Sequence, residues 1–242
     1  MRDYLVLFVQ VTRHGTYLDG FAGPQEMALF DTWAARLVLE VQQLRNFHFF
    51  EKLPAGVAAL QLLRADPADR TITVWPGDFN ARIAELLNAQ TIGPKEATFC
   101  LLDQRTFECR WSSLVALAQH KPSGSYKIER FYFLAEKWLD RALHEQEDPG
   151  PPTAWWGRPD WKSLRGLSRQ RRAQVFVERF RAELGYRYVM ARPILERDAA
   201  GAPVMYYMIH ASDHSNAPEL MRRAYDSAVL PGGEQLRWSW RT

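Results

Sequence analysis

Short apolar runs alternate with amphipathic helical patterns along most of the chain, and this alternation restricts the fold more than any other feature. Apolar runs such as FCLL and FYFL are typical of parallel strands that are covered on both faces. In the first helical segment, Leu29, Trp33, Leu37 and Val41 share one stripe. The pattern predicts strands at 17–19, 47–52, within 71–80, at 97–103 and from 127, and helices at 26–41, 54–64, 81–90 and 111–120.

The last third of the chain changes this arrangement. A basic helix that begins near Arg169 is stopped by Gly185, and residues 217–229 predict a final helix. Between them, two long strands around the turn at 198–203 predict an antiparallel hairpin. Five strand–helix units followed by a hairpin predict an α/β fold with a doubly wound, mostly parallel seven-stranded sheet. This resembles the Rossmann-like fold of class I S-adenosylmethionine (SAM) methyltransferases, and we expect one such domain over residues 1–242.

Composition narrows the class of protein. The 242 residues are 47% apolar and 24% charged, which is ordinary for a soluble globular protein. No apolar run reaches the length of a membrane span, and the N-terminal run differs from a signal peptide in length and flanks. Two cysteines, Cys100 and Cys109, make neither a disulfide framework nor a zinc cluster. We therefore expect a cytoplasmic protein without a structural metal, in which both thiols are structural.

The positive charge is concentrated in residues 158–197. That stretch carries four acids, at Asp160, Glu178, Glu183 and Glu196, and eleven basic residues: Arg158, Lys162, Arg165, Arg169, Arg171, Arg172, Arg179, Arg181, Arg187, Arg192 and Arg197. It is therefore strongly positive, while the whole chain has a net charge of only +3. Such a face suits a polyanion such as nucleic acid, and a solvated helix face is the alternative interpretation.

Residues 145–167 hold a proline cluster and three tryptophans, which predict a long loop, lid or insertion. Indole rings beside cations can stack on bases and neutralise phosphates. On this basis Trp155, Trp156 and Arg158 are candidate substrate-binding residues, whereas packing against the domain is favoured for Trp161.

The first predicted strand runs into the loop DGFAG, and its small residues allow the chain to pass close to a ligand. In an open α/β sheet, ligands bind outside the carboxyl ends of the strands. An acid at the end of the second strand can accept both ribose hydroxyls, and one after the third strand can accept an adenine amino group. The candidate cofactor-binding residues are Asp19, Gly20, Phe21, Ala22, Gly23, Glu51, Asp78 and Phe79.

Two alternatives to this site stay open. The residues could simply be turn and cap residues. A dinucleotide site fits less well, because the Gly-x-Gly-x-x-Gly fingerprint is absent and Gln25 stands where a third small residue is expected. Separately, His210, Asp213 and His214 could bind a metal or relay a proton, although turn and cap roles are favoured at a strand end.

The segments YLDGFAGP, FFEK and GDFN, with the tail segments ELGYRYV, MYYMIHASDH and APELMRRAYDSAV, resemble the three-Cys-motif partner protein (TcmP) family over residues 15–230. This resemblance implies a class I methyltransferase-like protein that uses SAM and associates with a radical-SAM-like protein carrying a three-cysteine motif. The chain departs from the family pattern in two places. Gln25 replaces the last glycine of FAGPG, and LLDQRTFECRW replaces an Asp-Pro-Phe-Gly type motif after the fourth strand.

The loop after the fourth strand is where an acceptor is expected. Amino-group methyltransferases often place Asp/Asn-Pro-Pro-aromatic there, with a polar oxygen for the amine and a ring that stacks on a flipped base. Asp103 and Phe107 are the candidates for these two roles. Arg105 adds a cation near the site, which suits an acceptor that bears a carboxylate or phosphate.

Two functional hypotheses follow. The first is a SAM-dependent methyltransferase that acts on or with nucleic acid. The second is a non-catalytic scaffold that grips nucleic acid or the radical-SAM-like partner, because the loop after the fourth strand lacks both prolines. A nicotinamide-dependent enzyme is a weaker third option.

Overall fold

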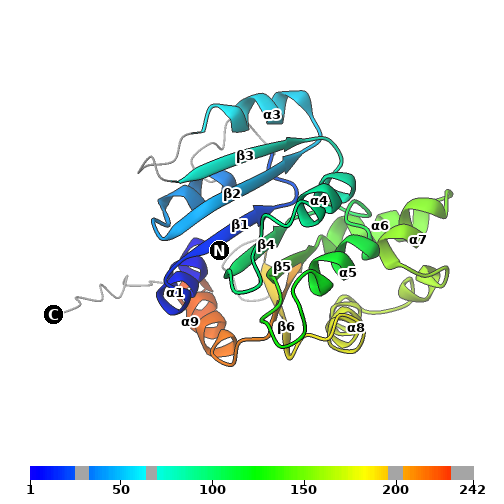
Figure 1. The fold of residues 1–242 in the computed structure, drawn as a ribbon. Coiled ribbons are helices and arrows are strands. Elements are labelled where there is room, and N and C mark those ends of the chain that lie inside the picture. The colour runs from blue at the N-terminus through cyan, green and yellow to red at the C-terminus, as the bar shows by residue number, and fades with distance from the viewer. Residues whose placement is uncertain (25–32, 64–69, 196–203, 230–242) are drawn as a thin grey trace.

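A seven-stranded sheet forms the centre of the computed structural model, which describes residues 1–24, 33–63, 70–195 and 204–229 (Figure 1). The strands are β1 (Gly15–Asp19), β2 (Leu44–Glu51), β3 (Thr71–Pro76), β4 (Thr98–Leu102), β5 (Glu129–Leu134), β6 (Tyr188–Leu195) and β7 (Val204–Ser212). Their order is β3-β2-β1-β4-β5-β7-β6. Strands β1 to β5 are parallel, whereas β7 is antiparallel to both of its neighbours. The predicted fold class, including the terminal hairpin, is confirmed.

Helices cover both faces of this sheet (Figure 1). They are α1 (Arg2–Thr12), α2 (Ala34–Leu37), α3 (Pro54–Gln61), α4 (Phe79–Asn88), α5 (Trp111–Gln119), α6 (Glu136–Glu145), α7 (Gly150–Trp156), α8 (Arg169–Ala182) and α9 (Ala217–Val229), with 3-10 turns η2 (Val38–Glu40) and η3 (Trp161–Leu164). Helices α1, α2, α3 and α9 share one apolar core, and α4 to α8 share the other. No helix in the described ranges is long and apolar enough to cross a membrane.

The central strands divide their side chains between these two cores. In β1, Tyr17 belongs to one core and Leu18 to the other, and in β4 the neighbours Phe99 and Cys100 divide in the same way. Successive side chains of a strand point to opposite faces, so both faces need apolar residues. All five residues of β1 and of β4 are buried, which accounts for their continuous apolar character.

Residues 145–167 do not form the long loop that the sequence predicts, because they fold into α7 and η3. Their three indoles are buried, with Trp155 0% and Trp156 3% exposed. The indole of Trp155 donates to the hydroxyl of Tyr132 at 2.8 Å. The rings of Trp155 and Trp156 each lie 5.3 Å from the ring of Phe176 on α8. The prediction that Trp155 and Trp156 bind substrate is therefore wrong for the described structure, since these rings fill the core between α7 and α8.

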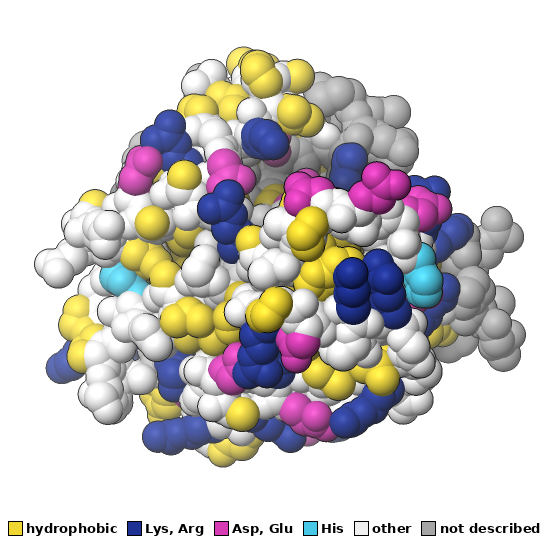
Figure 2. Space-filling view, turned by 90° about the vertical axis from the view of Figure 1, so that its right-hand side faces the viewer, with side chains coloured by type: hydrophobic (Ala, Val, Ile, Leu, Met, Phe, Trp, Pro, Cys, Tyr) yellow, Lys and Arg dark blue, Asp and Glu magenta, His cyan; other side chains and the backbone are white. Residues whose placement is uncertain are grey.

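Most cations of the basic stretch also serve internal contacts. Arg172 is 1% exposed and lies 3.3 Å from Glu136, while Arg181 donates to the carbonyl oxygen of Val189 at 2.6 Å. Arg158 pairs with Glu183 at 2.6 Å. The face shown in Figure 2 accordingly mixes Lys and Arg with Asp and Glu. The prediction of a concentrated positive face is wrong for these residues; Glu196 and Arg197 lie outside the described ranges.

Two further differences separate the predicted elements from the observed ones. The N-terminal apolar run forms α1, which the sequence pattern did not assign. The helix predicted at 26–41 is described only from residue 33, where α2 and η2 are short and Val41 lies beyond them. Gln25 and the hairpin turn at 198–203 lie outside the described residues.

Candidate functional site

A cavity of about 720 Å³ lies outside the carboxyl ends of β1 to β4. The loops after these four strands and the first turns of α7 line it. Figure 2 looks onto this side of the molecule, and a hollow is visible in its upper half. Nine residues predicted as cofactor-binding, substrate-binding or catalytic line the cavity: Gly20, Phe21, Gly23, Glu51, Asp78, Phe79, Asp103, Arg105 and Phe107. The topology thus brings together side chains that lie far apart in the sequence.

Glu51 lies at the end of β2 and fastens the loop after β1. One carboxylate oxygen, Oε2, accepts from the backbone N–H of Gly23 at 2.8 Å, and Oε1 accepts from that of Leu53 at 2.6 Å. A Cβ on Gly23 would lie 2.2 Å from Oε2, and one on Gly56 would lie 2.7 Å from Cγ of Glu51. Two glycines therefore allow backbone to approach Glu51 closely. Each oxygen keeps a second lone pair for a ligand hydroxyl.

Asp19 and Ala22 do not line the cavity. The backbone of Ala22 is bonded on both sides, to the carbonyl oxygen of Phe50 at 2.9 Å and to the indole of Trp33 at 2.6 Å. The Asp19 carboxylate is 1% exposed and accepts from the hydroxyl of Tyr17 at 3.2 Å and the backbone N–H of Phe21 at 3.3 Å. Burial raises the pKa of Asp19 to about 7. Asp19 and Ala22 therefore stabilise the loop after β1 without facing the cavity.

Asp78 caps the N-terminus of α4 by accepting from the backbone N–H of Ala81 at 3.3 Å. Its neighbour Asn80 was not predicted as a site residue, yet it joins two walls of the cavity. The amide of Asn80 donates to the carbonyl oxygen of Glu108 at 2.8 Å and accepts from the backbone N–H of Arg110 at 2.8 Å. An Asn at a helix start is common, so its presence there does not point to this bridge.

Polar side chains of the loop after β4 accept hydrogen bonds from the backbone of the same loop. Buried Gln104 accepts from the backbone N–H of Cys109 at 2.9 Å, and Glu108 accepts from that of Arg105 at 2.9 Å. Burial, with a contribution from the Glu108 carboxylate, raises the pKa of Asp103 to about 6. The ring of Phe107 meets Trp155 edge to face at 5.1 Å. The loop thus presents a carboxylate and a ring to the cavity even though it lacks both prolines.

Three basic residues, Lys52, Arg105 and Arg110, also line the cavity. All three are exposed, and their side chains make no hydrogen bond or ion pair with another residue in the part of the chain that the structure describes. In this they differ from Arg158, which was predicted at the substrate site but pairs with Glu183 and does not line the cavity. Cations free to meet an anion therefore stand at the rim, outside the basic stretch.

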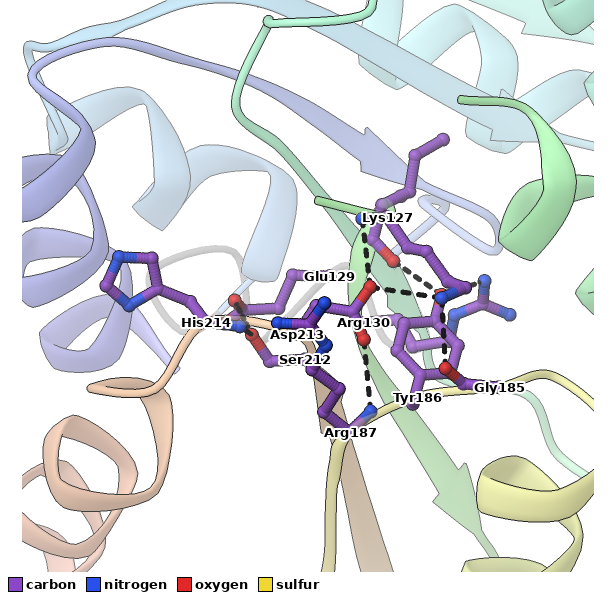
Figure 3. Close-up of polar contacts among 10 residues, drawn as sticks. Lys127, Glu129, Arg130, Gly185, Tyr186, Arg187, Ser212, Asp213 and His214 are labelled. Atoms are coloured by element: carbon purple, nitrogen blue, oxygen red, sulfur yellow. Dashed lines mark hydrogen bonds and ion pairs between the residues drawn. The ribbon is translucent and has the colours of Figure 1, made fainter. Parts of the chain in front are cut away.

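The residues of the motif HASDH do not converge on one point, and Figure 3 shows the ring of His214 directed away from Asp213. Asp213 pairs with Lys127 at 3.1 Å and accepts from the backbone N–H of Arg187 at 3.0 Å. His210 instead lies 3.0 Å from the buried Glu129, and His214 accepts from the backbone N–H of Asn216 at 3.2 Å. Within the described ranges, no three His, Cys, Asp or Glu side chains gather as metal ligands. The turn and cap interpretation therefore fits Asp213 and His214.

Comparison with known proteins gives a likeness in structure only. No family model and no curated protein matches the chain in sequence. Trm1 from Pyrococcus horikoshii, solved with S-adenosyl-L-methionine, is similar over 91% of this chain and 56% of its own, with a TM-score of 0.50 and 15% identity. The chain has a class I methyltransferase-like fold. The match covers little more than half of the length of Trm1.

TYW2 from M. jannaschii, solved with AdoMet, matches over 88% of this chain and 76% of its own, with a TM-score of 0.37 and 12% identity. Because no family model matches, the resemblance to TcmP proteins stays a prediction. The likeness to Trm1 shows a methyltransferase-like fold and nothing further.

Proposed function

We propose that this protein binds SAM in the cavity and transfers its methyl group. One observation carries the proposal: Gly23, Glu51, Asp78 and Asp103, each at or just after the end of a different parallel strand, line a single cavity. This is the edge of the sheet at which open α/β folds bind their ligands. The volume of about 720 Å³ also lies in the range of small-molecule sites.

The residues present fit the parts of SAM. Glu51 would accept the ribose hydroxyls with the lone pairs that Gly23 and Leu53 leave open. Asp78 would accept the adenine amino group, because its cap bond uses Oδ1, and Oδ2, which accepts from the amide of Asn80 at 3.4 Å, keeps a second lone pair. The ring of Phe79 lies 5.3 Å from the rings of both Phe21 and Phe50, and the three rings supply an apolar wall for the adenine ring.

SAM, when bound, supplies an electrophilic methyl group. The protein's task is to hold the acceptor in line with it and to take up the proton that the acceptor loses. Asp103 would accept this proton, because a carboxyl with a pKa of about 6 is ionised at neutral pH yet remains a usable base. Phe107 would press the acceptor toward Asp103 and exclude water from it.

We propose nucleic acid as the acceptor class, supported by the cations Lys52, Arg105 and Arg110 at the rim. The resemblance to TcmP proteins supports two further proposals: association with a radical-SAM-like protein and a single domain over residues 1–242. A cytoplasmic location is proposed from composition alone.

Calorimetric titration with SAM and with its demethylated product tests the cofactor. We expect micromolar binding of one or both, and about a tenfold or greater loss in Glu51→Ala, because a buried hydrogen-bond partner is worth about 1–3 kcal/mol. Glu85→Ala is the matched control, since Glu85 pairs with Arg82 on the exposed face of α4. Absence of binding to a folded sample would overturn the proposal and favour the scaffold hypothesis.

A further inference from the structure

A second cavity lies beside the candidate site, and Arg105 lines both. This second cavity, of about 520 Å³, is lined by Arg105, Thr106 and residues of α6 and its C-terminal end. Arg105 lines both cavities and makes no side-chain hydrogen bond or ion pair with the residues described. A ligand that leaves the first cavity on this side passes directly over an open guanidinium.

An exposed aromatic ring lies beyond that guanidinium. Trp138 on α6 lines the second cavity and is 39% exposed, although large apolar side chains usually bury their surface. Its ring meets Tyr206 on β7 edge to face at 6.4 Å, which supports the indole from one side. Arg141 lines the same cavity and, among the described residues, is held only by an exposed contact of 3.7 Å with Glu145.

The order along this surface is ring, cation, ring: Phe107 in the first cavity, Arg105 between the cavities, and Trp138 in the second. A polynucleotide has the matching order of base, phosphate and base. Only unpaired bases offer their faces to such rings, which excludes a duplex. A lone phosphate or a phosphopeptide would leave the second ring unused.

We propose that the acceptor is single-stranded nucleic acid, with one base beside Phe107, its phosphate on Arg105 and the next base stacked on Trp138. This rests on the proposed function for the identity of the first cavity, but the polynucleotide surface can be tested without it. The buried Trp155 and Trp156 have no part in it.

The test is fluorescence anisotropy with labelled single-stranded oligomers of dT and of U, with the same sequences as duplexes, in the absence of SAM. We expect Trp138→Ala to weaken binding of the single strands at least about fivefold. Arg105→Ala should lower the slope of log affinity against log salt by about 0.7. The controls are Tyr126→Ala, an exposed ring that lines a different cavity, and Arg158→Ala, a cation already paired; both should bind as wild type does.

Wild-type affinity in Trp138→Ala, tighter duplex binding, or displacement of the oligomer by a phosphopeptide but not by unlabelled single strand would overturn the inference. Titration of the same samples with SAM separates the two proposals. If SAM binds and no oligomer does, this inference alone fails. If the oligomers bind as expected and SAM does not, the surface stands and methyl transfer is refuted.

Discussion

Glu51 and Gly23 are joined by a hydrogen bond of 2.8 Å from the backbone N–H of Gly23 to Oε2. The bond connects the loop after β1 to the end of β2, across two strands that pair in parallel. It places the carboxylate against the backbone so closely that no side chain fits at position 23. The loop after β1 and the end of β2 therefore keep a fixed position relative to each other in the candidate site.

Gly23→Ala should break this geometry. The added Cβ would lie 2.2 Å from Oε2, so either the loop or the carboxylate must move. We expect SAM affinity to fall about tenfold or more and stability to fall by about 1–3 kcal/mol, measured by calorimetry and urea denaturation. Gly166→Ala is the matched control, because its Cβ would meet no atom within 4 Å. Equal SAM affinity in both variants would refute the assigned role of Glu51.

SAM affinity should rise with pH through the range in which Asp103 ionises. Burial raises the pKa of Asp103 to about 6, and a bound sulfonium cation favours the ionised carboxylate. SAM should therefore bind about tenfold more weakly at pH 5 than at pH 7.5. The demethylated product lacks the cation, so its affinity should change less. Calorimetry at several pH values checks this, and an unaltered pH dependence in Asp103→Asn would contradict it.

Asp19→Asn should stabilise the protein at high pH. The folded-state pKa of Asp19 is about 7, above its unfolded value, so its contribution to stability is present at acid pH and is lost as pH rises toward 7. An Asn keeps the oxygen that accepts from Phe21 and cannot ionise. Between pH 4 and pH 8 the stability of the variant relative to wild type should increase by about 2–4 kcal/mol. A difference that is constant with pH in urea denaturation would count against this.

Arg179→Ala should cost more than an ordinary surface change. Its guanidinium lies 3.6 Å from the ring centre of Trp111 and 3.9 Å from that of Trp156, and it donates to the carbonyl oxygen of Trp156 at 2.7 Å. We expect a loss of about 2–4 kcal/mol in thermal or urea denaturation. Arg171→Ala, which removes an exposed ion pair, should cost less than about 1 kcal/mol. Equal losses would contradict the assigned role.

The sequence predicted the sheet well because its central strands have no exposed face. Once β1 and β4 are buried on both sides, their apolar runs stand out, and the following helices show the usual 3.6-residue period. The N-terminal run was missed because α1, which packs beside α9, contains residues that equally suit a strand. The tryptophans of α7 were misassigned because composition alone does not tell a buried indole from an exposed one.

The candidate site was predictable to the extent that it follows strand ends. Glu51, Asp78 and Asp103 each lie at or near the end of a predicted strand, so their convergence on one edge follows from parallel pairing. The bridge through Asn80 and the exposed Trp138 were not predictable, because each depends on which elements the fold places opposite it. The positive face predicted for residues 158–197 was wrong for the same reason. Arg172 and Arg179 carry charge, but their partners lie on other helices or turns.

The order of the strands also governs how this chain can fold as it is synthesised. β1 pairs with β4 through Thr16 and Thr98, and β5 pairs with β7 through Arg130 and Ala211. The inner edge of β1 therefore stays open until β4 has emerged, and one edge of β5 waits for the last strand. Such distant pairings slow folding and leave apolar edges exposed in the growing chain. Assembly of the site must follow closure of the sheet, because Asp103 takes its place only when β4 does.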